Sequence, residues 1–74
     1  MSKDTTENSK RVIAVASVGD KTFQIVESLP VGFYLFVFQG GRCTHDYLQN
    51  DAEMAKRCAH QEFGVPIDGW SQLS

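Results

Sequence analysis

Apolar and β-branched residues fill the first part of the chain in segments separated by glycine turns, a pattern typical of antiparallel strands. Residues 11–18 and 21–27 predict the first two strands. Gly19-Asp20 between them predicts a hairpin, because a type II′ turn needs the positive φ that glycine supplies at its first central position. Pro30 and Gly32 then interrupt the pattern, since proline cannot donate to a strand ladder and glycine is conformationally permissive.

A third strand is predicted over residues 33–38, where six consecutive residues are apolar. The Gly40-Gly41 pair predicts the next turn. It does not indicate a phosphate-binding loop, because the glycine spacing and the lysine of that motif are absent. Residues 42–47 predict a fourth strand. That strand is shorter and more polar, as is typical of a strand at the edge of a sheet.

One helix is predicted over residues 51–63. Asn50 is expected to cap its N-terminus with Glu53 reaching back in a capping box, and Gly64 is expected to end it. The expected buried stripe has the three-and-four spacing of an amphipathic helix and comprises Ala52, Ala55, Cys58 or Ala59, and Phe63. Beyond the helix, the residues spaced to fold back over its end are Val65, Ile67 and Trp70.

These elements predict an α+β fold, in which an antiparallel meander of three or four strands carries one C-terminal helix on one face, in the order β-β-β-β-α. Residues 1–10 are polar and are expected to be a disordered tail. Residues 11–70 are expected to form the single domain, and residues 71–74 a frayed C-terminus.

Charge and cysteine content narrow the function classes. The chain has seven Lys and Arg against nine Asp and Glu, and this acidic balance disfavours nucleic acid as a partner. Two cysteines without a hydrophobic signal segment fit a reducing cytoplasm. No apolar run approaches the roughly 18 residues that span a bilayer. We therefore expect a soluble, cytoplasmic protein without a membrane segment.

A resemblance to known proteins rests on residues 32–70. The shared features are a glycine-aromatic strand at Gly32-Phe33-Tyr34, Gly41-Arg42, Asp46, alanines at positions 55 and 59, Glu62-Phe63-Gly64, and Trp70. This combination resembles a group of small uncharacterised bacterial proteins. The resemblance implies a bacterial domain of sheet plus helix and implies no activity, since none is established for the group. Tyr47-Leu48-Gln49 departs from the Thr-Trp-His that related sequences often carry there, which weakens any idea of shared chemistry.

Two Cys-x-His pairs offer residue types that zinc accepts. Cys43 and His45 are two apart on a strand and are expected to share a face, whereas Cys58 and His60 diverge by about 200° on a helix. The four side chains therefore should not converge, and we expect no metal site. Asp46 could complete a nucleophilic group with Cys43 and His45, but alternation places it on the opposite face. We expect no catalytic residue, no cofactor and no enzyme activity.

The third strand is apolar on both faces, and one helix can cover only one of them. If Phe33, Leu35 and Val37 face the helix, then Tyr34, Phe36 and Phe38 form an aromatic surface on the other side, joined by neighbours from the first two strands. A contiguous apolar surface of this kind usually marks an interface. The alternative is that the N-terminal residues or residues 65–70 cover that face within one chain.

The leading hypothesis is a non-catalytic protein-interaction domain that forms a homodimer or binds another protein through Tyr34, Phe36 and Phe38. Small size and acidic charge suggest, by analogy, an inhibitor or an immunity-type protein. The alternative function is a binder of a small molecule or of single-stranded nucleic acid on the same aromatic face. Residues 31–38 match the signature of RNA-recognition strands poorly, because they lack its leading basic residue and one of its aromatic positions.

Overall fold

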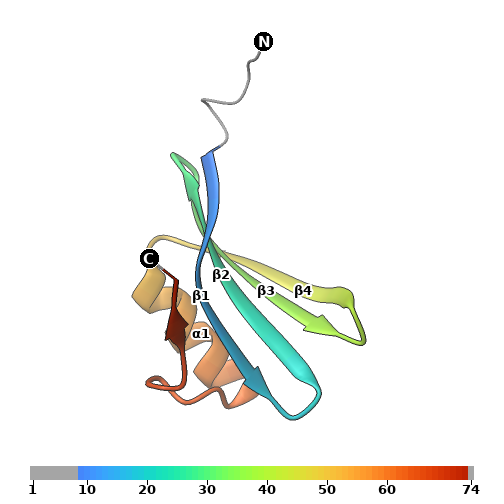
Figure 1. The fold of residues 1–74 in the computed structure, drawn as a ribbon. Coiled ribbons are helices and arrows are strands. Elements are labelled where there is room, and N and C mark those ends of the chain that lie inside the picture. The colour runs from blue at the N-terminus through green and yellow to red at the C-terminus, as the bar shows by residue number, and fades with distance from the viewer. Residues whose placement is uncertain (1–8, 74) are drawn as a thin grey trace.

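The computed structural model describes residues 9–73 and confirms the predicted antiparallel α+β meander (Figure 1). The elements in chain order are β1 (Ser9–Val18), β2 (Lys21–Leu29), β3 (Gly32–Gln39), β4 (Arg42–Gln49), α1 (Ala52–Phe63) and β5 (Ser71–Gln72). Their order in the sheet is β4-β3-β2-β1-β5, and every neighbouring pair is antiparallel. Four strands follow one another as expected, and a short fifth strand joins the far edge.

Glycines set the geometry of two hairpins. Gly19 has a φ of 61°, and no non-glycine residue in the described range has a positive φ, so Asp20 adopts the ordinary sign that a type II′ turn allows. Gly40 and Gly41 have φ values of 61° and 79°. Positive φ at both central positions is the pattern of a type I′ turn, whose twist matches that of the flanking strands. These turns hold β1–β2 and β3–β4 in register.

The core lies between α1 and one face of the sheet. The largest fully buried side chains on the strands are Phe23, Ile25, Leu35 and Val37. Ala55 and Ala59 on α1 are also fully buried, and because alanine is small the helix axis can lie close to the strands. Partly buried hydrophobic residues surround this cluster: Ile13, Phe33, Tyr47, Cys58, Phe63 and Trp70. Of the predicted stripe, Ala55, Ala59, Cys58 and Phe63 contact the core, whereas Ala52 is only partly buried and lies outside the cluster.

The N-cap of α1 is Asp51, so the prediction of Asn50 as the cap was wrong. Asp51 has extended backbone angles, and its Oδ1 accepts a hydrogen bond of 2.8 Å from the Met54 amide. Asn and Asp are equally good caps, and the point at which the chain leaves β4 decides between them. Glu53 instead pairs with Arg57 at 3.0 Å, one helical turn along.

Gly64 ends the helix as expected. Its φ is 75°, and its amide donates to the His60 carbonyl at 2.9 Å, while the next amide, that of Val65, donates to Ala59 at 3.3 Å. Glycine adopts this left-handed conformation without the steric penalty of a Cβ. The chain then reverses, and Val65 is fully buried against the core.

The C-terminal segment departs from the prediction in two places. Ile67 is 47% exposed and does not join the core, although Trp70 does. Ser71–Gln72 form β5 against β1 rather than a frayed end, and the Leu73 amide donates to the Ile13 carbonyl at 2.9 Å. A bulge in β1 between Val12 and Ala14 lies at this contact. Pairing between residues about sixty positions apart leaves no local signal in the sequence.

The predicted tail also needs adjustment. Residues 9 and 10 belong to β1, because they pair with the end of β2. The remainder of the predicted tail, residues 1–8, lies outside the described residues. Between residues 9 and 73 no helix has the length and apolar character required to cross a membrane.

Candidate interaction face

The face of the sheet opposite α1 is called the open face here. Directly opposed residues on neighbouring strands share a face, so the register assigns its members. They are Lys10, Val12, Val15 and Ser17 on β1; Thr22, Gln24, Val26 and Ser28 on β2; Tyr34, Phe36 and Phe38 on β3; and Cys43, Asp46 and Leu48 on β4. The buried core residues of the same strands occupy the alternate positions, facing the helix. Tyr34, Phe36 and Phe38 therefore lie on the open face.

The three aromatic side chains of β3 form a continuous row. Tyr34 and Phe36 stack with ring centroids 5.4 Å apart and an interplanar angle of 11°, and Phe36 and Phe38 are 6.4 Å apart at 48°. All three are partly exposed, whereas Leu35 and Val37 between them are fully buried on the helix side. We call these three side chains the aromatic row.

The C-terminal segment does not cover the open face. Val65 belongs to the core cluster that contains the helix alanines, and Trp70 packs against the same cluster. Figure 1 shows α1 and the C-terminal segment beside the sheet, with α1 lying along one side only. Within residues 9–73 no helix or strand packs on the open face. Val26 is only 7% exposed because Val12 and Tyr34 flank it in the sheet.

The open face is nearly free of charge. Lys10 on β1 and Asp46 on β4 are its two formally charged residues, and they lie on different strands. Arg11 and Glu27 lie in the alternate register row, on the helix side, where they form an ion pair of 3.0 Å. An apolar centre with one charge of each sign toward its edges is typical of a protein contact surface rather than of a phosphate-binding surface.

A bulge in β4 overturns one expectation about side-chain direction. The register shifts between Val37 and Phe38, so that Cys43 opposes Phe38 and His45 opposes Val37. Cys43 therefore lies on the open face together with Asp46, and His45 lies on the helix side, although simple alternation places Cys43 with His45 and opposite Asp46. Thr44 occupies the extra position, where its hydroxyl donates to the Val37 carbonyl at 3.3 Å.

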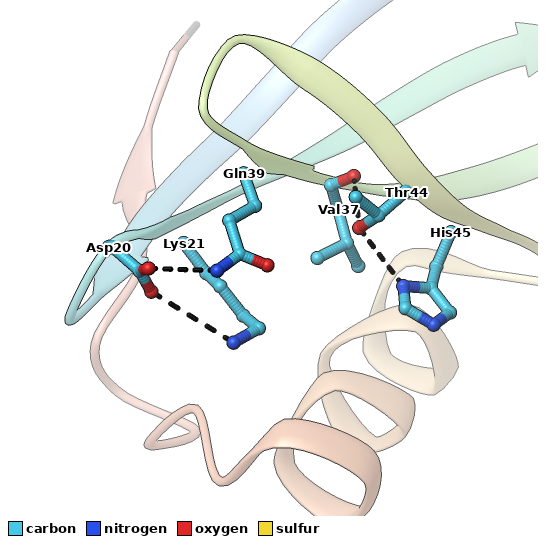
Figure 2. Close-up of polar contacts among 6 residues, drawn as sticks. All are labelled: Asp20, Lys21, Val37, Gln39, Thr44 and His45. Carbon is cyan, nitrogen blue, oxygen red and sulfur yellow. Dashed lines mark hydrogen bonds and ion pairs between the residues drawn. The ribbon is translucent and has the colours of Figure 1, made fainter.

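Polar contacts tie the two hairpin ends together on the helix side of the sheet (Figure 2). The Gln39 amide group donates to the Asp20 carboxylate at 2.8 Å, so the β1–β2 turn is linked to the end of β3. His45 Nδ1 lies 3.0 Å from the Thr44 hydroxyl, and Figure 2 shows its ring directed toward the helix. There the ring meets Phe63 edge-on at 5.3 Å. These residues hold the sheet in shape and leave the open face to other contacts.

The candidate zinc ligands do not converge. Cys43 is exposed on the open face, and Cys58 is partly buried against the core. His60 Nδ1 lies 3.0 Å from the Val65 carbonyl at the helix end, whereas His45 packs on Phe63. Among the described residues no group of three or more His, Cys, Asp or Glu side chains could hold a metal ion, and no pocket is present.

The Cys58 thiol is in a surrounding that opposes its ionisation. Burial raises the pKa of Cys58, and the nearby Glu62 carboxylate raises it further. The pKa of Tyr47, which contacts the same part of the helix, is raised by burial and then by the charges of Glu62 and Cys58. A nucleophilic cysteine needs a lowered pKa, so this site has the electrostatics of a structural thiol.

Comparison of the chain with protein-family models, curated proteins and solved structures finds no match. The resemblance to small bacterial proteins therefore stays a prediction.

Sequence reasoning missed one member of the open face. Leu48 is half exposed and opposes Tyr34, but the fourth strand was predicted to end at Tyr47. The signal that could have found it is the continued alternation from Asp46, since residues two apart on a regular strand share a face.

Proposed function

We propose that the protein is a non-catalytic interaction domain that binds a protein partner through the open face. The observation that carries this proposal is the aromatic row, Tyr34, Phe36 and Phe38, exposed in part on a sheet face that no element of residues 9–73 covers. Monomeric proteins rarely leave a large contiguous apolar surface in water, and Tyr and Phe are enriched at interface cores. An inhibitor or immunity-type role would use the same surface.

The chemistry of this face favours protein over nucleic acid. Stacking of single-stranded bases on a sheet is normally combined with several cations that follow the backbone, and the open face offers only Lys10. A small molecule is usually bound in a concave site, and the described part of the chain contains no pocket. The two free cysteines support a reducing compartment such as the cytoplasm.

Phe36→Asp tests the proposal, because it places a carboxylate in the centre of the aromatic row. Met54→Asp is the matched control, since it makes the same change of charge at a half-exposed position on α1, on the other side of the sheet. Amide spectra of the isotope-labelled protein, recorded in bacterial extract and at increasing concentration, report which surface is engaged.

We expect the open-face amides of the wild type and of Met54→Asp to broaden or shift, and those of Phe36→Asp to remain unchanged. Far-UV circular dichroism of both variants should retain the helix signal. Changes that map to α1 or to the outer edge of β4 instead would overturn the proposal. Changes induced by a single-stranded oligonucleotide and reversed by salt would favour the nucleic-acid alternative.

A further inference from the structure

We propose that the partner on the open face is a second copy of this chain, packed face to face about a two-fold axis that runs along the strands. This inference rests on the proposed function, since it names the occupant of the same face. With the axis between β2 and β3, each β3 lies over the β2 of the other copy, and each β4 lies over the other β1. Two sheets packed in this way form a sandwich about 10 Å thick.

The shape of one half of the open face is complementary to the shape of the other half. β3 carries three large aromatic rings, whereas β2, which the proposed axis places over them, carries Thr22, Gln24, Val26 and Ser28, none of which has a ring. The neighbouring β1 positions are Val12, Val15 and Ser17. The half of the face formed by β3 and β4 therefore contains a ridge of aromatic rings, and the half formed by β1 and β2 is lower. The proposed axis exchanges the two halves, so the ridge of each copy meets the lower half of its partner. A two-fold contact requires a self-complementary surface of this kind.

Charge selects this axis over the other two-fold arrangement. The proposed axis places each β4 over the partner's β1, so the two Asp46 carboxylates lie at opposite edges of the contact, each over Val15 of the partner in the same register row. An axis across the strands would instead place β4 over β4 and bring the two Asp46 carboxylates onto the same strand pair. Although each copy has a net charge of −2, the open faces carry balanced charge and can meet without repulsion.

The size of the face limits the area that the contact can bury. The open face provides roughly half of the 20–30 side chains that a standard interface uses on each side, which corresponds to about 900 Å² buried in total. Contacts of this size belong to the weak class of specific interfaces. The dimer is therefore expected to dissociate at concentrations on the order of micromolar.

Molar mass in solution tests the association. Sedimentation equilibrium of the full chain across a hundredfold concentration range should show the wild type and Met54→Asp passing from monomer to dimer. Phe36→Asp should bind its own copies at least tenfold more weakly, because each dimer would bury two unpaired carboxylates. A wild type that stays monomeric throughout, or a Phe36→Asp variant that dimerises like the wild type, overturns the inference.

Crosslinking tests the arrangement. Ser17 and Cys43 lie in the same register row on β1 and β4, so the proposed axis places Ser17 of one copy over Cys43 of the other. Within one copy the two positions are three strands apart, about 14 Å at the usual strand spacing, which a bis-thiol reagent of about 8 Å does not span. In a Cys58→Ala background, Ser17→Cys should give covalent dimers through Cys43.

Val18→Cys in the same background is the matched control, because Val18 is the next residue along β1 and points to the helix side. It should give no more covalent dimer than the background protein. If Ser17→Cys crosslinks no faster than Val18→Cys, the proposed arrangement is wrong.

The two proposals fail in different ways. A wild type that remains monomeric while its open-face amides respond to another protein, with loss of that response in Phe36→Asp, overturns the dimer and leaves the interaction function standing. A dimer that Phe36→Asp does not weaken, together with open-face amides that never respond, overturns both.

Discussion

Gly32 occupies a position that only glycine should tolerate, and Gly32→Ala tests the pairing of β3 with β4. Gly32 has a φ of 150°, a region that residues with a Cβ rarely adopt. A Cβ added there would lie 2.7 Å from the Gln49 carbonyl oxygen and 3.3 Å from Cδ1 of Leu48. Because the nearest atom belongs to the backbone, the end of β4 would have to move away from β3.

The expected loss of stability has two parts. A strained backbone conformation costs about 1–3 kcal/mol, and overpacking against a fixed neighbour costs about as much again. Gly40→Ala is the matched control, since Gly40 also has a positive φ but a Cβ there would meet no atom within 4 Å. We therefore expect a loss of about 3 kcal/mol for Gly32→Ala and about 1 kcal/mol for Gly40→Ala.

Thermal and urea unfolding measure this difference. Trp70 is the single tryptophan and packs against the core, so its fluorescence reports global unfolding. A loss of 1 kcal/mol lowers the Tm of a domain of this size by about 4–8 °C, so Gly32→Ala should unfold at least about 8 °C below Gly40→Ala. Equal Tm values for the two variants would refute the proposed clash with Gln49.

Two further predictions concern the helix and its contact with β4. Asp51→Ala should lower the free energy of unfolding by about 1 kcal/mol, because it removes the cap, whereas Asn50→Ala should change it by less than about 0.5 kcal/mol; urea titration that ranks them in the opposite order would contradict the assigned cap. Burial and Glu62 raise the pKa of Cys58 and Tyr47 in the folded protein above the usual 9.0 and 10.0, so the unfolded chain loses these protons first as pH rises. The free energy of unfolding should therefore decrease above pH 9.0, and the decrease should be smaller in Glu62→Gln; an equal slope in both proteins would contradict this.

Local signals in the sequence were sufficient where one or two residues control the backbone. Gly19 and Gly64 were placed correctly because each position requires a positive φ that glycine adopts without strain. The prediction of Asn50 as the N-cap was wrong because Asn and Asp cap helices equally well, and only the path of the chain out of β4 makes Asp51 the cap. Cys43 and His45 were placed on one face because a bulge cannot be read from alternation alone.

Assigning the open face required both the alternation of side chains in the sequence and the packing seen in the tertiary structure. Alternation along β3 determined that Tyr34, Phe36 and Phe38 lie on one side and Leu35 and Val37 on the other, since side chains on a strand have a period of two. It did not determine which side the helix covers, because both sets are apolar. Packing of the small helix alanines onto the Leu35 side decided that question.

The amino-acid sequence alone therefore determined the order of the main elements, their turns, and the presence of a surplus apolar face, while it left the strand number at three or four. The tertiary structure decided which face that is, how β4 bulges, and where the C-terminal strand pairs. The physical reason is the range of the interactions. Backbone preferences and side-chain periodicity act over a few residues, whereas strand pairing and burial join residues that are distant in the chain.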